Sequence, residues 1–257
     1  MFKGRIIDHL SEQFNLHFNL ALEHAILSLH EKRTYIATLR LWKNDKAVIL
    51  GRNQDLNIEI NRTFCNTNDI AFGRRISGGG AVYQDYGNIN ISFFVNKKII
   101  PSRFKNIKSR TLFFTRLFTN SLEYSGINNL HVVNDSSIFL KDKKISGSAG
   151  YTRGDWILHH ATLLFSTNLD NLQNSLKARE IYPARKGRQS RYSPTTNLLK
   201  SFNVEIWKEN LFKISSEKLQ TQFSVQFLDN EEIEKAKILE KTIYSTKKWI
   251  FDGYRSE

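Results

Sequence analysis

Hydrophobic and polar positions change their spacing along the chain, and these changes mark the predicted elements. Apolar residues recur at helical spacing over 15–31 and again over 105–124, so each segment predicts an amphipathic helix. A shorter helix is predicted over 57–66 and a C-terminal helix over 231–244. Helices therefore account for the longer periodic segments.

Alternating or short apolar runs predict strands between these helices. The clearest alternation is over 88–95, where one face carries Ile89, Ile91, Phe93 and Val95 and the other carries Asn88, Asn90 and Ser92. Further strands are predicted at 35–42, 46–50, 70–75, 137–140, 143–146 and 156–165. Two hairpins are expected, joining 35–42 to 46–50 and 137–140 to 143–146. Short turns between many strands favour an α/β (α+β) fold with a mixed sheet flanked by helices, not a strict βαβ array.

Composition places the chain among globular proteins. It has 257 residues, of which 40% are hydrophobic, enough for a buried core in one large or two small domains. It contains no internal repeat and only three prolines, so no proline-rich linker divides it. The net charge of +13 favours acidic partners: nucleic acid, nucleotides, an anionic membrane or an acidic protein. Charge alone does not choose among them.

Cysteine use and the first residues bear on location. Cys65 is the single cysteine, which excludes an intramolecular disulfide and a CxxC zinc or redox site. Residues 1–15 carry several charges and lack the apolar core of a signal peptide. No apolar run approaches the ~20 residues that span a bilayer. These features predict a cytoplasmic protein that does not insert into membranes.

Residues 74–83, RRISGGGAVY, are the most informative stretch. Three consecutive glycines weaken a strand, but they allow positive φ and let a ligand approach the backbone. Exposed N–H groups there can hold a phosphate or carboxylate, and the arginines add bidentate donors. The segment is neither a Walker A loop nor a GxGxxG motif. On spacing alone, a glycine-rich turn beside a solvated basic pair explains it equally well.

Several segments together resemble one known family. Residues 74–88, RRISGGGAVYQDYGN, closely resemble the RRxSGGGAVYHDxGN signature of lipoate–protein ligase A, in the biotin/lipoate ligase superfamily. Other family motifs are resembled in the right order by NLALE at 19–23, LW at 41–42, VILGRNQ at 48–54, ND at 134–135, KKISGSA at 143–149, HATLL at 160–164, residues 186–190 and TNL at 196–198. The likeness covers about 15–250. Any one motif would be weak, but the ordered set is specific.

The resemblance implies a fold and an activity. The fold would be the biotin/lipoate ligase catalytic domain, with a largely antiparallel sheet flanked by helices. The enzyme would activate lipoate with ATP, with Mg²⁺ held mainly through phosphate oxygens. It would then pass the lipoyl group from lipoyl-AMP to a lysine of an acceptor. The expected acceptors are the lipoyl domain of a 2-oxoacid dehydrogenase acyltransferase and the glycine-cleavage H protein.

The resemblance also implies a domain organisation. A single catalytic domain is expected over 1–257, without the C-terminal accessory domain that single-chain ligases of the family carry. A separate accessory protein would then assist adenylation. Nucleic acid and membrane are not expected as partners.

The same likeness assigns site residues. Lys144 is the expected catalytic residue, contacting both the acyl carbonyl and the α-phosphate. The ATP and lipoyl-AMP site is expected to comprise Arg75, Ser77, Gly78, Gly79, Gly80, Ala81, Val82, Tyr83, Asn88, Asp135, Lys144, Ser148 and Ala149. Gln84 and His160 are expected in the lipoyl pocket. Taken without the motif, Lys144 is more typical of a solvated hairpin lysine, and Asp135 is as typical of a turn cap.

Three further expectations concern the surroundings of this site. An apolar acyl chain needs an apolar slot, for which Tyr83, Phe93 and Ile145 are candidates, although each is typical of plain core. Adjacent strand residues face opposite ways, so His159 and His160 would not chelate one metal together. The basic segment 178–191 is either a solvated loop or a mobile lid over the acyl-adenylate.

Two departures from the family and two alternative functions stand beside this interpretation. Gln84 replaces a family histidine and Ala161 a family glycine, which puts the acyl preference in question. A related octanoyl/lipoyl transferase uses a cysteine thioester and no ATP, yet Cys65 lies in a predicted helix, where a cysteine is usually a small buried residue. A nucleic-acid-binding protein is a remote alternative, because aromatic residues do not interleave with the basic ones.

Overall fold

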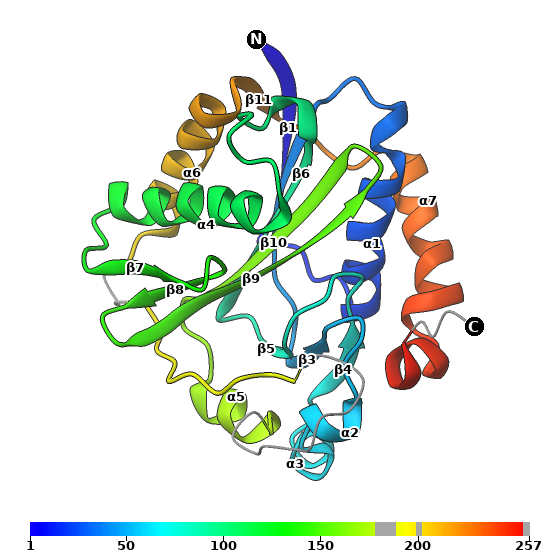
Figure 1. Cartoon of the computed structure of the whole chain (residues 1–257). Helices are drawn as coiled ribbons and strands as arrows, with labels where there is room; N and C mark the ends of the chain where they lie inside the picture. Colours follow the sequence, from blue (N-terminus) through cyan, green and yellow to red (C-terminus); the bar gives the residue numbers. More distant parts are fainter. Residues whose placement is uncertain (178–188, 199–201, 254–257) are drawn as a thin grey trace.

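The computed structural model describes residues 1–177, 189–198 and 202–253, and within these ranges eleven strands form two sheets. The large sheet has the order β11-β1-β2-β6-β10-β9-β8-β7 and the small one β4-β3-β5 (Figure 1). The strands are β1 (Phe2–His9), β2 (Ala37–Trp42), β3 (Ala47–Leu50), β4 (Ala71–Arg74), β5 (Val82–Gln84), β6 (Asn88–Asn96), β7 (Leu130–Val133), β8 (Ser137–Leu140), β9 (Lys143–Arg153), β10 (Trp156–Leu164) and β11 (Thr221–Val225). In the large sheet β1 runs parallel to β2 and β11, and the other pairs are antiparallel, as predicted.

Helices cover both faces of the large sheet (Figure 1). They are α1 (Leu16–Leu29), α2 (Leu56–Glu59), α3 (Arg62–Thr67), α4 (Ile107–Tyr124), α5 (Leu169–Ser175), α6 (Val204–Leu219) and α7 (Asn230–Leu239). Short 3-10 turns occur at His30–Lys32 and Lys97–Ile99, and π-helical turns at Glu240–Tyr244 and Lys248–Asp252. α4 and α6 pack on one face and α1 and α7 on the other. None of the described helices is both long and apolar enough to cross a membrane.

Strand β6 shows why the layers form, and it confirms the predicted alternation. Its odd-numbered residues, such as Phe93, pack in the apolar layer beneath α4 and α6. On the other face Asn88, Asn90 and Ser92 are only 0–2% exposed. Buried polar side chains need hydrogen-bond partners, so a polar strand face in the interior is itself a sign of a functional site.

Most predicted helices and strands are confirmed within a few residues. Asn15 caps α1 by accepting a hydrogen bond from the Phe18 N–H at 2.8 Å, which sets the start of that helix. Asn106 caps α4 in the same way. The hairpin of β8 and β9 is present, although β9 extends well beyond its predicted end. The helix predicted at 57–66 is instead two short helices, α2 and α3, because the chain is extended at Ile60 before Asn61 caps α3.

The predicted hairpin between 35–42 and 46–50 is wrong. Both edges of β2 are occupied, one by β1 and the other by β6. The chain leaves the large sheet after Trp42, and β3 pairs with β4 and β5 in the small sheet. Asn44 fixes this departure, because its side chain accepts from Asn19 at 2.9 Å and donates to Gln84 at 2.7 Å.

Strand β1 is absent from the predictions because charged residues interrupt its pattern. Arg5 is buried and paired with Glu232 of α7, and its Nη1 donates to Glu232 Oε2 at 3.0 Å. Asp8 accepts from Lys208 Nζ of α6 at 2.7 Å. Each charge is thus neutralised by a helix about 200 residues away, a pairing that local periodicity does not report.

Candidate functional site

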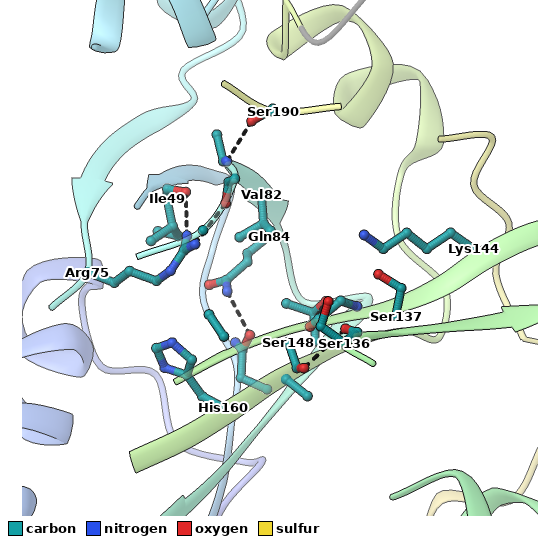
Figure 2. A pocket seen from close by; sticks show the side chains of 18 of the residues that line it. Ile49, Arg75, Val82, Gln84, Ser136, Ser137, Lys144, Ser148, His160 and Ser190 are labelled. Atoms are coloured by element: carbon teal, nitrogen blue, oxygen red, sulfur yellow. Dashed lines mark hydrogen bonds between the residues drawn. The ribbon is translucent and has the colours of Figure 1, made fainter. Parts of the chain in front are cut away.

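A cavity of about 580 Å³ lies between the two sheets. Strands β6, β9 and β10 form its floor, and β5 with the loop at 76–81, here called the glycine loop, forms its roof (Figure 2). Glu23, Trp42, Asn90 and His160, each 1–9% exposed, close one end, here called the sealed end. The other end, the mouth, is bordered by the half-exposed Asp135 and by the exposed Asn134 and Lys108.

The cavity brings together most of the residues that the sequence assigned to the site. Those that line it are Arg75, Gly79, Gly80, Ala81, Val82, Gln84, Asp135, Lys144, Ser148, Ala149 and His160. Four assigned residues lie outside its lining: Ser77, Gly78, Tyr83 and Asn88. The motifs at 74–84, 134–135, 143–149 and 160–164, distant in the chain, therefore converge on one volume.

Each of the four residues outside the lining has a clear place. Ser77 and Asn88 are fully buried beside the cavity, and Asn88 Nδ2 donates to Asn90 Oδ1 at 3.0 Å. Gly78 is exposed at the turn of the glycine loop. Tyr83 lines a smaller neighbouring cavity of about 110 Å³, and burial raises the pKa of its hydroxyl to about 12.

The expectation that Phe93 and Ile145 form walls of the acyl slot is wrong. Both are 0% exposed and belong to the apolar layer on the opposite face of the sheet. The adjacent pair His159 and His160 faces opposite ways, as predicted. His159 stacks on Phe114 of α4 with ring centroids 4.9 Å apart, whereas His160 lines the cavity.

The glycine loop is shaped so that only glycine fits at its centre. Gly79 has φ +95°, and a Cβ there would lie 2.9 Å from Arg75 Nη2. A Cβ on neighbouring Gly51 would lie 2.1 Å from the Gly79 carbonyl oxygen. The N–H groups of Gly78, Gly79 and Gly80 donate to no residue within the described ranges. Of these, Gly79 and Gly80 line the cavity, so two donors without a described partner are placed there for an anion.

Two adjacent arginines in this segment have different tasks. Arg74 points away from the cavity and donates to carbonyl oxygens of Gly51, Gln54, Trp249 and Ile250 at 2.7–2.9 Å. Arg75 lines the cavity and holds the glycine loop, because Nη2 donates to the carbonyls of Gly78 and Gly80 at 2.7 and 2.8 Å. Burial lowers the pKa of Arg75 to about 10, so it is charged at neutral pH.

Glu23, His160 and Ser77 form a hydrogen-bonded series at the sealed end. His160 Nδ1 lies 3.0 Å from Glu23 Oε1, and His160 Nε2 lies 2.6 Å from Ser77 Oγ. Burial alone would raise the pKa of Glu23, but its contacts with His160 and with the hydroxyl of Ser92 outweigh burial. The pKa of Glu23 therefore lies below its usual value, and the group is a carboxylate.

Lys144 reaches the cavity from β9, across from Arg75 and His160 (Figure 2). Backbone hydrogen bonds to Pro194 and Thr196 at 2.8 and 3.1 Å hold its main chain. Its amine makes no hydrogen bond or ion pair with any residue of the described ranges, and burial lowers its pKa. A desolvated cation without a protein partner is positioned to bind a ligand anion.

At the mouth, a tight turn between β7 and β8 presents polar groups. Asn134 and Asp135 both have positive φ, 51° and 61°, and the Asp135 carboxylate lies 3.6 Å from Lys108 Nζ. Ser148 Oγ donates to the Ser136 carbonyl at 3.1 Å. No group of three metal-ligating side chains occurs in the part of the chain that is described. Among the described residues, Asp135 is the one carboxylate at the mouth of the cavity.

Most of the basic segment expected to form a lid, 178–188, lies outside the described residues. The residues just after it border the cavity. Ser190 Oγ accepts the Ala81 N–H at 2.8 Å, and the Ser190 N–H donates to Glu59 at 3.1 Å. Ser190 therefore meets the glycine loop directly.

Sequence reasoning missed Glu23, Trp42 and Asn90 as site residues, although the first two fall in matched motifs. Glu23 and Asn90 each give a signal in retrospect. Glu23 interrupts the apolar run of α1, and a carboxylate in such a run needs a buried partner. Asn90 lies on the polar face of a strand whose other face is apolar.

The family follows from a direct comparison. A profile described as "Lipoyl protein ligase A/B catalytic domain" matches residues 15–223. The chain belongs to this family. It is 31% identical over 179 residues to the probable lipoate-protein ligase A of Mycoplasma genitalium, covering 69% of this chain and 51% of that protein. It is 30% identical over 236 residues to lipoate–protein ligase 1 of Staphylococcus aureus, covering 91% and 69%. The chain thus spans about half the length of some curated ligases that it matches.

Solved structures of lipoate ligases have the same fold. The bipartite lipoate protein ligase of Thermoplasma acidophilum, studied with its E2 lipoyl domain, has a TM-score of 0.81 at 25% identity, covering 100% of this chain and 99% of that one. A Thermoplasma acidophilum ligase with bound lipoic acid has a TM-score of 0.79 at 26% identity, covering 97% and 99%. A lipoate-protein ligase A bound with ATP has a TM-score of 0.79 at 25% identity, covering 98% and 100%.

Proposed function

We propose that this chain activates lipoate with ATP and transfers the lipoyl group to a lysine of an acceptor protein. The observation that carries the proposal is one cavity lined by Lys144, whose amine has no protein partner in the described ranges, and by Gly79 and Gly80, whose N–H groups donate to no described residue. The cavity ends in a closed, largely buried compartment that can hold an acyl chain. Solved relatives with lipoic acid and with ATP support both substrates.

In the first step, a lipoate carboxylate oxygen attacks the α-phosphorus of ATP and pyrophosphate leaves. Both reactants are anions, so the enzyme must offset their repulsion. Lys144 supplies the positive charge, and Gly79 and Gly80 supply backbone donors, which cost no reorganisation when charge develops. The cavity also orients the two substrates, and this orientation contributes the remainder of the rate enhancement.

Asp135 bears on the role proposed for Mg²⁺. It is the single carboxylate that the described residues place at the mouth. That is too few ligands for a metal bound by these residues alone, but it suits a cation carried on phosphates. Mg²⁺ bound there would neutralise phosphate charge. Asp135 would contact it or its water shell.

In the second step, the acceptor lysine amine attacks the acyl carbonyl and AMP leaves. Lys144, beside both groups, stabilises the oxyanion and then the phosphate of AMP. The bipartite archaeal ligase and its E2 lipoyl domain support a lipoyl domain as acceptor and a separate accessory subunit as partner. We propose the glycine-cleavage H protein as a second acceptor, a single catalytic domain over 1–257 and a cytoplasmic location.

The alternative transferase needs a reactive cysteine, and Cys65 does not fit that role. It is 0% exposed and lines neither cavity. Its thiol lies 3.9 Å from the Ser175 carbonyl oxygen, and burial raises its pKa to about 11. A thiolate nucleophile requires the opposite, an exposed group with a lowered pKa.

Intact-mass measurement of a lipoyl-lacking acceptor domain tests the proposal. One arm receives this chain with lipoate, ATP and Mg²⁺, and the other receives this chain with pre-made lipoyl-AMP. A lipoyl mass gain in both arms supports both steps. A gain with lipoyl-AMP alone supports transfer and assigns activation to a complex with the partner. No gain in either arm contradicts the proposal.

A further inference from the structure

Four side chains connect the sealed end of the cavity to the glycine loop. Glu23 on α1 contacts His160 Nδ1, His160 Nε2 contacts Ser77 Oγ, and Ser77 Oγ lies 3.0 Å from Arg75 Nε. All four residues are 0–9% exposed. Because Arg75 also holds the carbonyls of the glycine loop, this series spans the distance between the two binding regions.

Donor and acceptor chemistry fixes the direction of the two outer bonds in the series. The Arg75 guanidinium can only donate, so Ser77 Oγ accepts from it. The carboxylate of Glu23 can only accept, so His160 Nδ1 carries a proton. In a neutral imidazole Nε2 is then an acceptor, and it receives the Ser77 hydroxyl proton.

This arrangement resembles a serine hydrolase triad in its contacts but not in its access. A nucleophilic serine must meet the substrate. Ser77 is 0% exposed and does not line the cavity, and Arg75 occupies the other side of its oxygen. Ser77 therefore acts through other residues.

We propose that Glu23 and Ser77 are positioning residues that hold the glycine loop in its ligand-binding shape through His160 and Arg75. Glu23 selects the Nδ1–H tautomer of His160, and Nε2 of that tautomer accepts the Ser77 hydroxyl proton, which turns the Ser77 oxygen lone pairs toward Arg75 Nε. Arg75 then keeps the Gly78 and Gly80 carbonyls turned inward. The inference rests on the proposed function for its ligands, but the tautomer itself does not depend on it.

A second consequence is coupling between substrates. Glu23 and His160 line the sealed end, where the acyl chain would lie. Arg75 and Gly79 line the part of the cavity at the glycine loop, where the nucleotide would lie. Loss of this hydrogen-bonded series should therefore uncouple nucleotide binding from lipoate binding. The nucleotide should bind more weakly and independently of lipoate, even though Ser77 touches neither ligand.

The test uses Ser77→Ala and Glu23→Gln, singly and together, with Ser121→Ala as the matched control. Ser121 is also a fully buried, hydrogen-bonded serine, but it lies on α4 away from the cavity. Nitrogen NMR of the ligand-free chain reports the His160 tautomer. Calorimetry with a methylene-bridged ATP analogue, with and without lipoate, reports nucleotide affinity. Pyrophosphate exchange separates KM for ATP from kcat.

We expect the Nδ1–H tautomer in the wild-type chain and a mixture in Glu23→Gln. Analogue affinity should fall roughly tenfold to a hundredfold in Ser77→Ala, the loss typical of a misplacement of ~1 Å. The double variant should lose little more than either single one, because both break the same series. Ser121→Ala should leave affinity unchanged.

An Nε2–H tautomer or a doubly protonated His160 in the wild-type chain would overturn the proposal, as would unchanged nucleotide affinity in a folded Ser77→Ala variant. Effects that multiply in the double variant would also contradict it. If the wild-type chain bound neither the ATP analogue nor pre-made lipoyl-AMP, the proposed function would fail. The His160 tautomer, measured without ligand, would then still decide the proposal for Glu23.

Discussion

The two ends of the cavity use charge in opposite ways. At the sealed end, Glu23 is fully buried, and its carboxylate is bonded to His160 and Ser92. Toward the mouth, the Lys144 amine has no protein partner in the described ranges, and Asp135 meets only the exposed Lys108. The paired groups hold the geometry, and the unpaired cation is left for the ligand.

This difference separates residues that stabilise the fold from residues that act on the ligand. A buried charge with a full set of partners is expensive to disturb, because removing one partner leaves the other unsatisfied. A desolvated charge without protein partners can be removed at little cost to the fold. Variants at the sealed end should therefore change stability and ligand coupling together, while a variant at Lys144 should change chemistry alone.

The largest effect is expected for Lys144→Met. Lipoyl-AMP formation should fall about 10²–10³-fold, the range found when one charge-stabilising donor is removed. The melting temperature should change little, because the amine forms no bond with the described residues. Pyrophosphate exchange measures lipoyl-AMP formation, and thermal unfolding measures the melting temperature. Full activity, or a large loss of stability with the activity loss, would contradict the comparison.

A second test replaces glycines in the loop between the two ends. Gly79→Ala should reduce adenylation more than about tenfold, because positive φ strains alanine by about 1 kcal/mol and its Cβ meets Arg75 at 2.9 Å. Gly78→Ala is the matched control for folding, since a Cβ there has no neighbour within 4 Å. Equal melting temperatures for the two variants would show that the φ argument is wrong.

A third test concerns the stability of the sealed end. Glu23→Gln should destabilise the fold by about 1–3 kcal/mol at neutral pH, the cost of losing a charged buried partner. The folded pKa of Glu23 lies below the ordinary value of 4.5, so its stabilisation is complete above that pH and is lost as pH falls through the folded pKa.

Thermal unfolding of wild type and Glu23→Gln across pH 3–8 measures this difference. The gap in melting temperature should be constant above about pH 5.5 and shrink toward pH 3. A gap that widens on acidification would mean that the Glu23 pKa is raised by burial instead of lowered by His160.

The smallest effect is expected for Cys65→Ser, because Cys65 lies outside both ends of the cavity. Because the thiol is buried and lines neither cavity, lipoyl transfer should stay within about twofold of wild type. The hydroxyl costs about 1 kcal/mol in stability, since it is placed in an apolar cluster. Intact mass of the acceptor domain measures transfer. Abolished transfer in a folded variant would support the cysteine transferase.

The sequence predicted the glycine loop and Lys144 because their chemistry is local. Unusual glycines require special backbone angles, and the ordered motifs identified the family. Alternation on β6 similarly predicted which residues share a face. These are properties of neighbouring residues, so they can be predicted without knowledge of the tertiary structure.

The features that the sequence analysis missed depend on contacts between distant segments. Glu23 and Ser77 meet through His160 only because α1, the glycine loop and β10 converge. The mistaken hairpin after Trp42 has the same origin, since β2 finds partners in β1 and β6. Phe93 and Ile145 were wrongly placed because an apolar strand residue can face either layer of the fold.

The central claim is that the cavity binds an acyl-adenylate between Lys144 and the glycine loop. Native mass spectrometry of the chain mixed with pre-made lipoyl-AMP tests this directly, since neither activation nor an acceptor is needed. The account predicts one bound lipoyl-AMP per chain in the wild type and a much reduced complex in Gly79→Ala. Absence of the complex in the wild type, or equal binding by both proteins, would contradict it.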